Sequence, residues 1–99
     1  MRIVSRKALR QFWEQHPDAR IPLESWYRTV KDASWRNITE VRAVFPSADP
    51  AGICTIFNIK GNHYRLIAAI HYNLQRVYIR NVLTHAEYDR GKWKSDCSC

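Results

Sequence analysis

The fold is decided by the stretch ICTIFNIK-GN-HYRLIAAIHY-NL-QRVYIRNVL, residues 53–83. Three of its segments are rich in β-branched and aromatic residues, which predicts strands at 53–60, 63–72 and 75–83. Gly61-Asn62 is typical of a two-residue hairpin turn, and Asn73-Leu74 is a weaker turn signal of the same length. We therefore expect an antiparallel meander of three strands.

The two turns also set the register in which the strands pair. The first turn predicts the pairs Phe57–Leu66 and Asn58–Arg65, and the second predicts Ala68–Ile79, Ile70–Val77 and Ile67–Arg80. Side chains alternate between the two faces of a sheet, so this register assigns each residue to one face.

The predicted faces differ sharply in polarity. One is apolar and consists of Thr55, Phe57, Ile59, Tyr64, Leu66, Ala68, Ile70, Val77 and Ile79. The other has no Asp or Glu and places Ile56, Ile67 and Ala69 among Asn58, Lys60, His63, Arg65, His71, Arg76, Tyr78 and Arg80. The first face is suited to receive helices, and the second is predicted to be a cationic platform.

The residues before the meander have a helical pattern. Residues 5–15 form an apolar stripe with Ser5 as a candidate N-cap, and residues 20–33 repeat the pattern around Leu23 and Trp26. Residues 41–45, Val-Arg-Ala-Val-Phe, are predicted to form a further short strand, which Pro46 ends and a loop follows.

The last predicted element is a short helix. Thr84 and Glu87 form a capping box, so the helix begins at His85. The expected fold class is α+β, with two N-terminal helices on one face of a mainly antiparallel four-stranded sheet. Residues 1–94 are predicted to be a single domain, and 95–99 a flexible tail.

The charge of the chain points to polyanionic partners. Among 99 residues, 16 are Lys or Arg and 9 are Asp or Glu, a formal net charge of +7. Nucleic acid, the ribosome, an acidic protein or an anionic membrane surface would each be attracted to such a domain. Charges occupy the N-terminus and no apolar run is long enough to span a bilayer, so we expect a cytoplasmic protein that does not insert into membranes.

The cysteines and histidines give no metal or disulfide signature. Three cysteines provide no disulfide framework, Cys54 is predicted to be a small core residue, and Cys97 and Cys99 alone do not make a zinc site. His63 and His71 are eight residues apart along one strand, too far to share an ion. No metal and no cofactor is expected.

The C-terminal half contains the side chains needed to cleave RNA without a metal. The 2′-hydroxyl of a ribose can attack the adjacent phosphate if a base, a cationic group and an acid are present. Arg65 and Arg80 are predicted to hold the phosphate, and His85 stands at a helix start, where the helix dipole favours a neutral imidazole. Tyr88, one turn later, can stack on a base or transfer a proton.

Simpler interpretations remain open. Arg65 and Arg80 can instead form ion pairs with Glu24, Glu40 or Glu87, His85 can be an ordinary surface residue, and Tyr88 can be part of the core. The chain would then be a non-catalytic basic module that binds RNA or the ribosome.

The sequence resembles the RelE/ParE superfamily of toxins, and more specifically HigB-type toxins. The resemblance is carried by AVFPSAD (43–49), FNIKGNHYRL (57–66), YIR (78–80) and THAEYD (84–89). It implies an endoribonuclease that cuts messenger RNA, often on the ribosome, and a helix-turn-helix antitoxin as partner. The gyrase-poisoning ParE branch of the superfamily is a further alternative.

The resemblance also implies roles for individual residues. Arg65, Arg80, His85 and Tyr88 fall on the family's motif positions and are the expected catalytic residues. The expected RNA-binding residues are Lys60, Asn62, His63, Arg76, Lys92 and Lys94.

Overall fold

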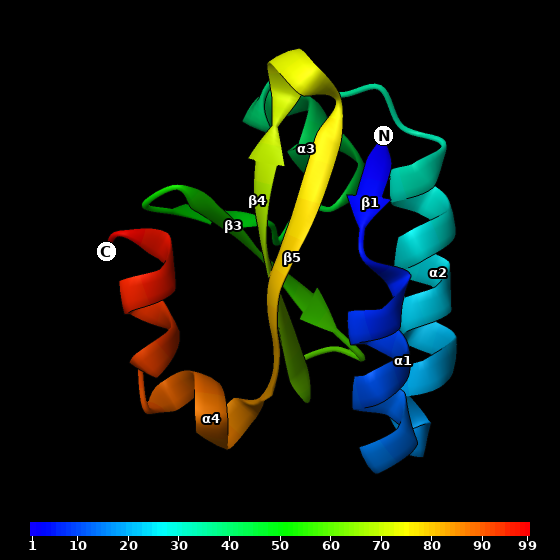
Figure 1. Cartoon of the computed structure of the whole chain (residues 1–99), viewed down its shortest axis with the longest axis vertical. Helices are drawn as coiled ribbons and strands as arrows, with labels where there is room; N and C mark the ends of the chain where they lie inside the picture. The colour runs from blue at the N-terminus through cyan, green and yellow to red at the C-terminus, as the bar shows by residue number, and fades with distance from the viewer.

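The computed structural model describes residues 1–99, and its sheet has five strands in the order β1-β5-β4-β3-β2 (Figure 1). The three central strands are β3 (Cys54–Ile59), β4 (Tyr64–His71) and β5 (Arg76–Thr84). They form the predicted antiparallel meander. The α+β class is confirmed, but the predicted four strands are one too few.

The register of the first hairpin is confirmed. Phe57 pairs with Leu66 and Asn58 with Arg65. The turn itself is wider than expected, since residues 60–63 connect the strands and His63 N–H donates to Lys60 O at 3.2 Å. Gly61 has φ +62°, a conformation that glycine adopts without steric cost.

The register of the second hairpin is confirmed only at one end. Ala68 pairs with Ile79 and Ile70 with Val77, but Ile67 pairs with Asn81. Arg80 is the extra residue of a β-bulge. The predicted pair of Ile67 and Arg80 is therefore wrong. Arg80 has no partner in the ladder between β4 and β5.

Two further strands form the edges of the sheet. β1 (Arg2–Val4) runs parallel to the start of β5, and the N-terminal amine donates to three carbonyls at the end of α2. β2 (Asp49–Ala51) pairs with β3 and contains Pro50, which an edge strand tolerates. Neither strand was predicted, because three residues are too few to show a period.

The helices cover one face of the sheet. α1 (Arg6–Gln15) and α2 (Arg20–Lys31) lie side by side, joined by the single turn η1 (Pro17–Ala19) (Figure 1). Leu9, Leu23 and Trp26 from this layer are buried with the apolar sheet residues in one cluster. The predicted packing of two N-terminal helices on the apolar face is thereby confirmed.

Residues 41–45 were predicted wrongly as a strand. They lie in and just after the helix α3 (Ile38–Val44), which Asn37 caps by accepting from the backbone N–H of Glu40 at 3.1 Å. The side chains of Ile38, Val41 and Phe45 are spaced as one helix face and contact the main core. The same five residues are mostly apolar and end before Pro46, and a run this short does not distinguish a strand from a helix.

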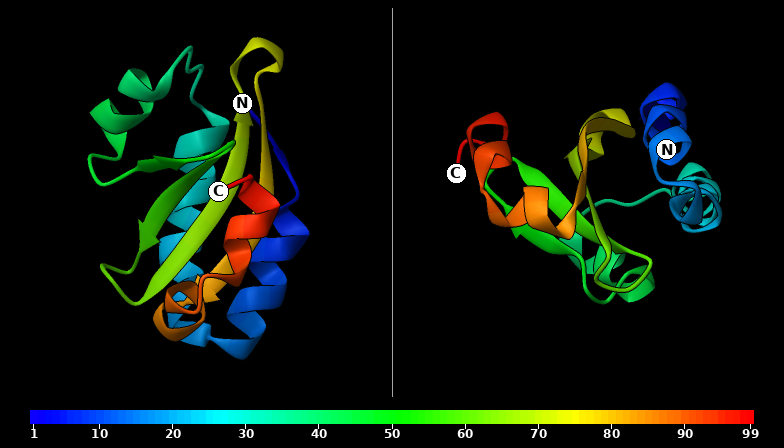
Figure 2. Two further views of the ribbon diagram at one scale, coloured as in Figure 1. Left: turned by 90° about the vertical axis from the view of Figure 1, so that its left-hand side faces the viewer. Right: turned by 90° about the horizontal axis from the view of Figure 1, so that it is seen from below.

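The second face of the sheet is covered by the end of the chain. α4 (His85–Asp89) is followed by η3 (Lys92–Cys97), and Figure 2 shows this segment and the α1–α2 pair on opposite sides of the molecule. Trp93 and Cys97 are buried against Ile56 and Ile67 in a second, smaller cluster. The predicted cationic platform is therefore interrupted by an apolar contact.

Cys54 is buried in the second cluster as predicted, but the expectation of no disulfide is wrong. Cys54 and Cys97, 43 residues apart, form a disulfide, and Cys97 is fully buried. Cys99 is free and exposed. The tail predicted to be flexible from residue 95 is thus ordered in a helical turn as far as Cys97, because a distant strand binds it.

Candidate functional site

The start of α4 brings three of the predicted residues together. The capping box is formed as expected, with Glu87 N–H donating to Thr84 Oγ1 and Thr84 N–H to Glu87 Oε1. His85 N–H donates to His63 O at 3.1 Å, which joins α4 to the turn between β3 and β4. Asn62, His63 and His85 line an open depression of about 290 Å³.

His85 has a carboxylate partner. Its Nε2 lies 3.2 Å from Asp89 Oδ2, one helical turn away, and both side chains are exposed. A carboxylate in this position can hold the imidazole ring in one orientation. His85 is therefore an exposed imidazole with a carboxylate beside it.

Arg65 and Tyr88 are in contact. The Arg65 guanidinium lies 5.1 Å from the centre of the Tyr88 ring, and Arg65 Nη1 donates to Asn62 O at 3.0 Å. Arg65 thus connects Tyr88 with the depression that His85 lines. We call Asn62, His63, Arg65, His85 and Tyr88 the α4 cluster.

Tyr88 is held from the C-terminal side by Trp93. The two rings are stacked, with centres 5.1 Å apart and planes 7° from parallel, and Trp93 Nε1 donates to Tyr88 O at 3.0 Å. The Tyr88 hydroxyl has no hydrogen-bond partner within the protein. Since Trp93 and Arg65 already contact the ring, the hydroxyl is the part of Tyr88 that is free to act.

Arg80 lies outside the α4 cluster. The bulge places it in a groove of about 410 Å³ between α1 and β5. The groove is lined mainly by polar side chains, with an apolar floor: Ala8, Gln11, Phe12, Gln15, His16, Ile79, Arg80, Asn81, Val82 and Glu87. The expectation that Arg65 and Arg80 hold one phosphate from the same face of the sheet depended on the register that the bulge breaks.

Neither Arg65 nor Arg80 is in an ion pair. The carboxylates that were alternative partners are occupied: Glu24 pairs with Arg20, Glu40 with Arg36, and Glu87 caps α4. The Thr84 N–H bond to Glu87 also holds the pKa of that carboxyl below its ordinary value. Both guanidinium groups are therefore free to bind an anion.

Two of the predicted RNA-binding residues, Lys60 and Arg76, lie outside the α4 cluster. Lys60 Nζ is 2.7 Å from Asp18 Oδ2, and Tyr64 donates to the other oxygen of Asp18 at 2.5 Å. These two bonds lower the pKa of Asp18, and the bond to Asp18 raises the pKa of Tyr64. Arg76 begins β5, roughly 26 Å along the strand from Thr84.

Lys92 and Lys94 are exposed beside α4. Arg90, which was not predicted from the sequence, lies with them. Lys92 and Arg90 line a groove of about 280 Å³ with Asn81, Leu83, Glu87, Trp93 and Asp96. Asn81 and Glu87 also line the groove that contains Arg80, so the two grooves meet at these residues. The only signal for Arg90 was its place among the basic residues after THAEYD.

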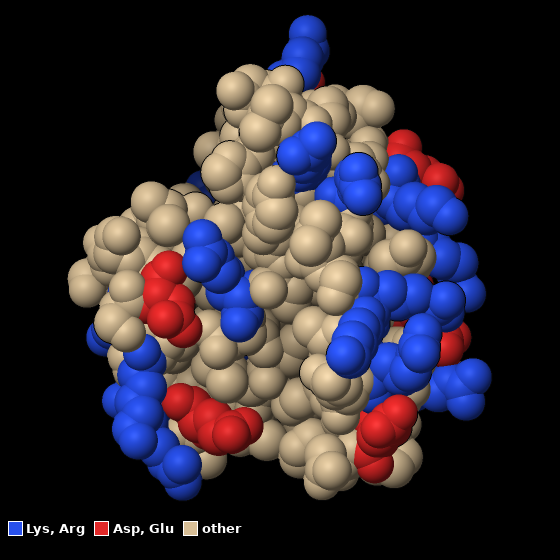
Figure 3. Space-filling model, in the orientation of Figure 1, with Lys and Arg blue, Asp and Glu red and all other residues tan.

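Positive charge gathers over two regions of the surface. Figure 3 shows Lys and Arg concentrated over α1 and α2 and again beside α4, with some Asp and Glu next to each group. No group of three or more His, Cys, Asp or Glu side chains is arranged to hold a metal ion. None of the helices combines the length and apolar character needed to cross a bilayer.

Comparison with known proteins identifies the family. Residues 19–91 match the family model described as HigB toxin, RelE-like toxic component of a toxin–antitoxin system. The chain is 33% identical over 92 residues to the mRNA interferase toxin HigB of Escherichia coli K12, covering 90% of this chain and 88% of that protein. It is 28% identical over 93 residues to the mRNA interferase HigB of Escherichia coli O6:H1, covering 91% and 90%. The chain therefore belongs to the HigB family of RelE-like toxins, the toxic components of toxin–antitoxin systems.

Proposed function

We propose that this toxin is a metal-independent endoribonuclease that cuts messenger RNA and thereby stops translation. The relatives that it matches along nearly their whole length are mRNA interferases. The observation that carries the proposal is the α4 cluster: a histidine with a carboxylate partner lines an open depression, and an arginine without an ion pair, bonded to Asn62 at that depression, contacts a tyrosine whose hydroxyl is free.

The α4 cluster supplies each group that the reaction needs. Arg65 binds the scissile phosphate and stabilises the charge that builds up on it. His85 accepts the proton of the 2′-hydroxyl as this oxygen attacks phosphorus and the bond to the 5′-oxygen breaks. The products are a 2′,3′-cyclic phosphate and a 5′-hydroxyl end, so no water or metal enters the cleavage step.

Tyr88 is assigned to proton transfer. Of the two roles open to a tyrosine here, base stacking needs an uncovered ring, and this ring already contacts Trp93 and Arg65. The free hydroxyl can donate a proton to the departing 5′-oxygen. His85 as base then serves the attacking oxygen, and Tyr88 as acid serves the leaving oxygen, of the phosphate bound by Arg65.

The two grooves beside β5 provide a path for the flanking nucleotides. Arg90, Lys92 and Lys94 carry free positive charge for the RNA backbone on one side of α4. On the other side, Arg80 stands among the carboxamides of Gln11, Gln15 and Asn81, which can both donate to and accept from the edge of an unpaired base. We assign the preference for particular cut sites to this groove. We assign to Lys60 and Arg76 only a lesser part in RNA binding.

As the toxic component of its system, the protein has an antitoxin partner. We assign this partner to the helix-turn-helix class, and the antitoxin would neutralise the toxin by keeping RNA from the α4 cluster. The ribosome is the second macromolecule expected to bind, because a messenger RNA is most accessible where it is translated.

The experiment that tests the proposal is induced expression, in a host whose cytoplasm allows disulfides to form, followed by mapping of messenger RNA ends. We expect new ends and growth arrest with the wild-type protein and with Arg36→Ala, a control that removes an exposed arginine paired with Glu40. Arg65→Ala and His85→Ala are expected to abolish both while still binding the antitoxin.

Two other results would replace the proposal. Growth arrest without new RNA ends would indicate a non-catalytic RNA or ribosome binder. DNA damage signalling without new RNA ends would indicate a gyrase poison. Undiminished cleavage by both variants would refute the assignment of the site.

A further inference from the structure

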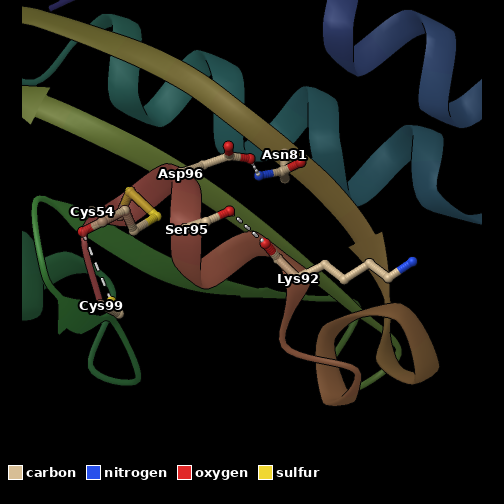
Figure 4. Close-up of a disulfide and its surroundings, with 7 residues drawn as sticks. Cys54, Asn81, Lys92, Ser95, Asp96 and Cys99 are labelled. Atoms are coloured by element: carbon tan, nitrogen blue, oxygen red, sulfur yellow. Dashed lines mark hydrogen bonds between the residues drawn. A yellow bond between two sulfur atoms is a disulfide. The ribbon is translucent and has the colours of Figure 1, made fainter.

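The end of the chain is tied to the sheet by a covalent bond. The disulfide joins Cys54, in β3, to Cys97, at the end of η3 (Figure 4). Cys97 is fully buried and Cys54 is 3% exposed. The bond therefore lies inside the second, smaller core and not on the surface.

Two further contacts dock the same segment beside the disulfide. The backbone N–H of Ile53 donates to Cys97 O at 2.9 Å. A Cβ at Gly52 would lie 1.9 Å from that same oxygen, so only glycine permits this approach. The loop before β3 is thus shaped to receive the backbone at Cys97.

Trp93 connects this docked segment to the α4 cluster. Its side chain is 6% exposed and lies in the same cluster as Cys54 and Cys97. It stacks on Tyr88 and donates to Tyr88 O, and Tyr88 in turn lies beneath the Arg65 guanidinium. An unbroken series of contacts therefore runs from the disulfide through Trp93 to Tyr88 and Arg65.

The main core does not depend on this series. The 14 buried residues that unite the helices with the sheet include neither cysteine of the disulfide nor Trp93. The second cluster has only five buried residues, two of them the bonded cysteines. Breaking the bond is thus expected to loosen η3 while the domain stays folded.

We infer that Trp93 is a positioning residue for Tyr88 and Arg65, and that the Cys54–Cys97 disulfide keeps it in place, so that RNA cleavage requires the oxidised protein. This inference rests on the proposed function. A dithiol would reverse the state: it transfers two electrons and two protons to the disulfide, leaving Cys54 and Cys97 as thiols, and itself becomes a cyclic disulfide. Without the bond, Trp93 is free to leave the Tyr88 ring.

The first experiment compares the two redox states of the purified toxin. Thiol labelling should find one free cysteine in the oxidised protein and three after dithiothreitol. Cleavage of a single-stranded RNA, free or bound to purified ribosomes, should fall at least about tenfold on reduction and return on reoxidation, with an unchanged far-UV circular dichroism spectrum. Cys97→Ala should be slow in both states, and Cys99→Ala should behave like the wild type.

The second experiment separates positioning from folding. Trp93→Ala should lower kcat at least about tenfold with little change in KM, whereas Trp93→Phe, which keeps a ring on Tyr88, should retain most of the activity. Equal rates for the oxidised and reduced wild type, or wild-type kcat in Trp93→Ala, would overturn the inference. Absence of cleavage by the oxidised wild type in both RNA assays would instead refute the proposed function, and the inference with it.

Discussion

Removing the disulfide should reduce the stability of the domain by an amount that follows from its place in the chain. The bond closes a loop between residues separated by 43 positions. Restricting an unfolded chain by a loop of this length stabilises the folded state by about 4 kcal/mol at 25 °C. Domains of this size commonly have free energies of unfolding of about 5 to 15 kcal/mol, so Cys97→Ala should remain folded but clearly weakened.

The assay is urea denaturation without reductant, followed by Trp fluorescence. With a dependence on urea of about 2 kcal/mol per molar, the midpoint of Cys97→Ala should fall by about 2 M. Cys99→Ala removes an exposed thiol outside the bond and should unfold like the wild type. In dithiothreitol the difference between Cys97→Ala and the wild type should largely vanish. Equal midpoints in the absence of reductant would refute the reasoning.

Three further predictions concern the loop before β3, an ion pair and the proposed acid. Gly52→Ala should lose at least about 1 kcal/mol more than Gly61→Ala, because both have positive φ but only Gly52 lies against another backbone; urea midpoints compare them. The pKa of Asp18 is lowered in the folded protein, so its contribution to stability is present at neutral pH and is lost as pH falls through and below its ordinary value of 3.8. In thermal melts from pH 7 to pH 3, the melting temperature of Asp18→Asn should therefore fall less than that of the wild type. Equal falls in melting temperature would contradict this. Tyr88→Phe should slow RNA cleavage about 100-fold without weakening RNA binding, and an unchanged rate would exclude the hydroxyl from proton transfer.

The sheet could be predicted because its signals are local and periodic. The turn at Gly61 and the alternation of polarity along 53–83 were sufficient to pair Phe57 with Leu66 and to identify the face that receives the helices. The capping box likewise placed the start of α4 at His85, because both of its partners lie within four residues. Such features depend on neighbours in the sequence.

The wrong predictions concern features that depend on a single residue or on a contact between residues distant in the sequence. The bulge at Arg80 inserts a single residue into the ladder, and a strand with alternating polarity has no sign of it in sequence. The pairing of Cys54 with Cys97 depends on how the end of the chain returns to β3, which three cysteines alone do not indicate. Residues 41–45 are too few to show a period, and the helix is stabilised by the Asn37 cap and by the burial of Val41 in the main core.

In the candidate site, too, local features could be predicted and distant contacts could not. The individual residues Arg65, His85 and Tyr88 could be chosen from residue type and motif, because the chemistry of RNA cleavage restricts which side chains can serve. Their arrangement could not, because the bond from His85 N–H to His63 O joins two segments that no local pattern connects. Trp93 was missed for a similar reason, since its role depends on the docked C-terminal segment.

The most direct test of the central claim is the chemistry of the cut ends. Purified oxidised toxin would be incubated with free messenger RNA in excess EDTA and, in parallel, with ribosome-bound messenger RNA in Mg²⁺, and the new ends would be analysed by mass spectrometry. Cleavage through the α4 cluster predicts 2′,3′-cyclic phosphate and 5′-hydroxyl ends at an undiminished rate, and none with His85→Ala. Ends that carry a 5′-phosphate, cleavage that EDTA abolishes, or full activity in His85→Ala would contradict it.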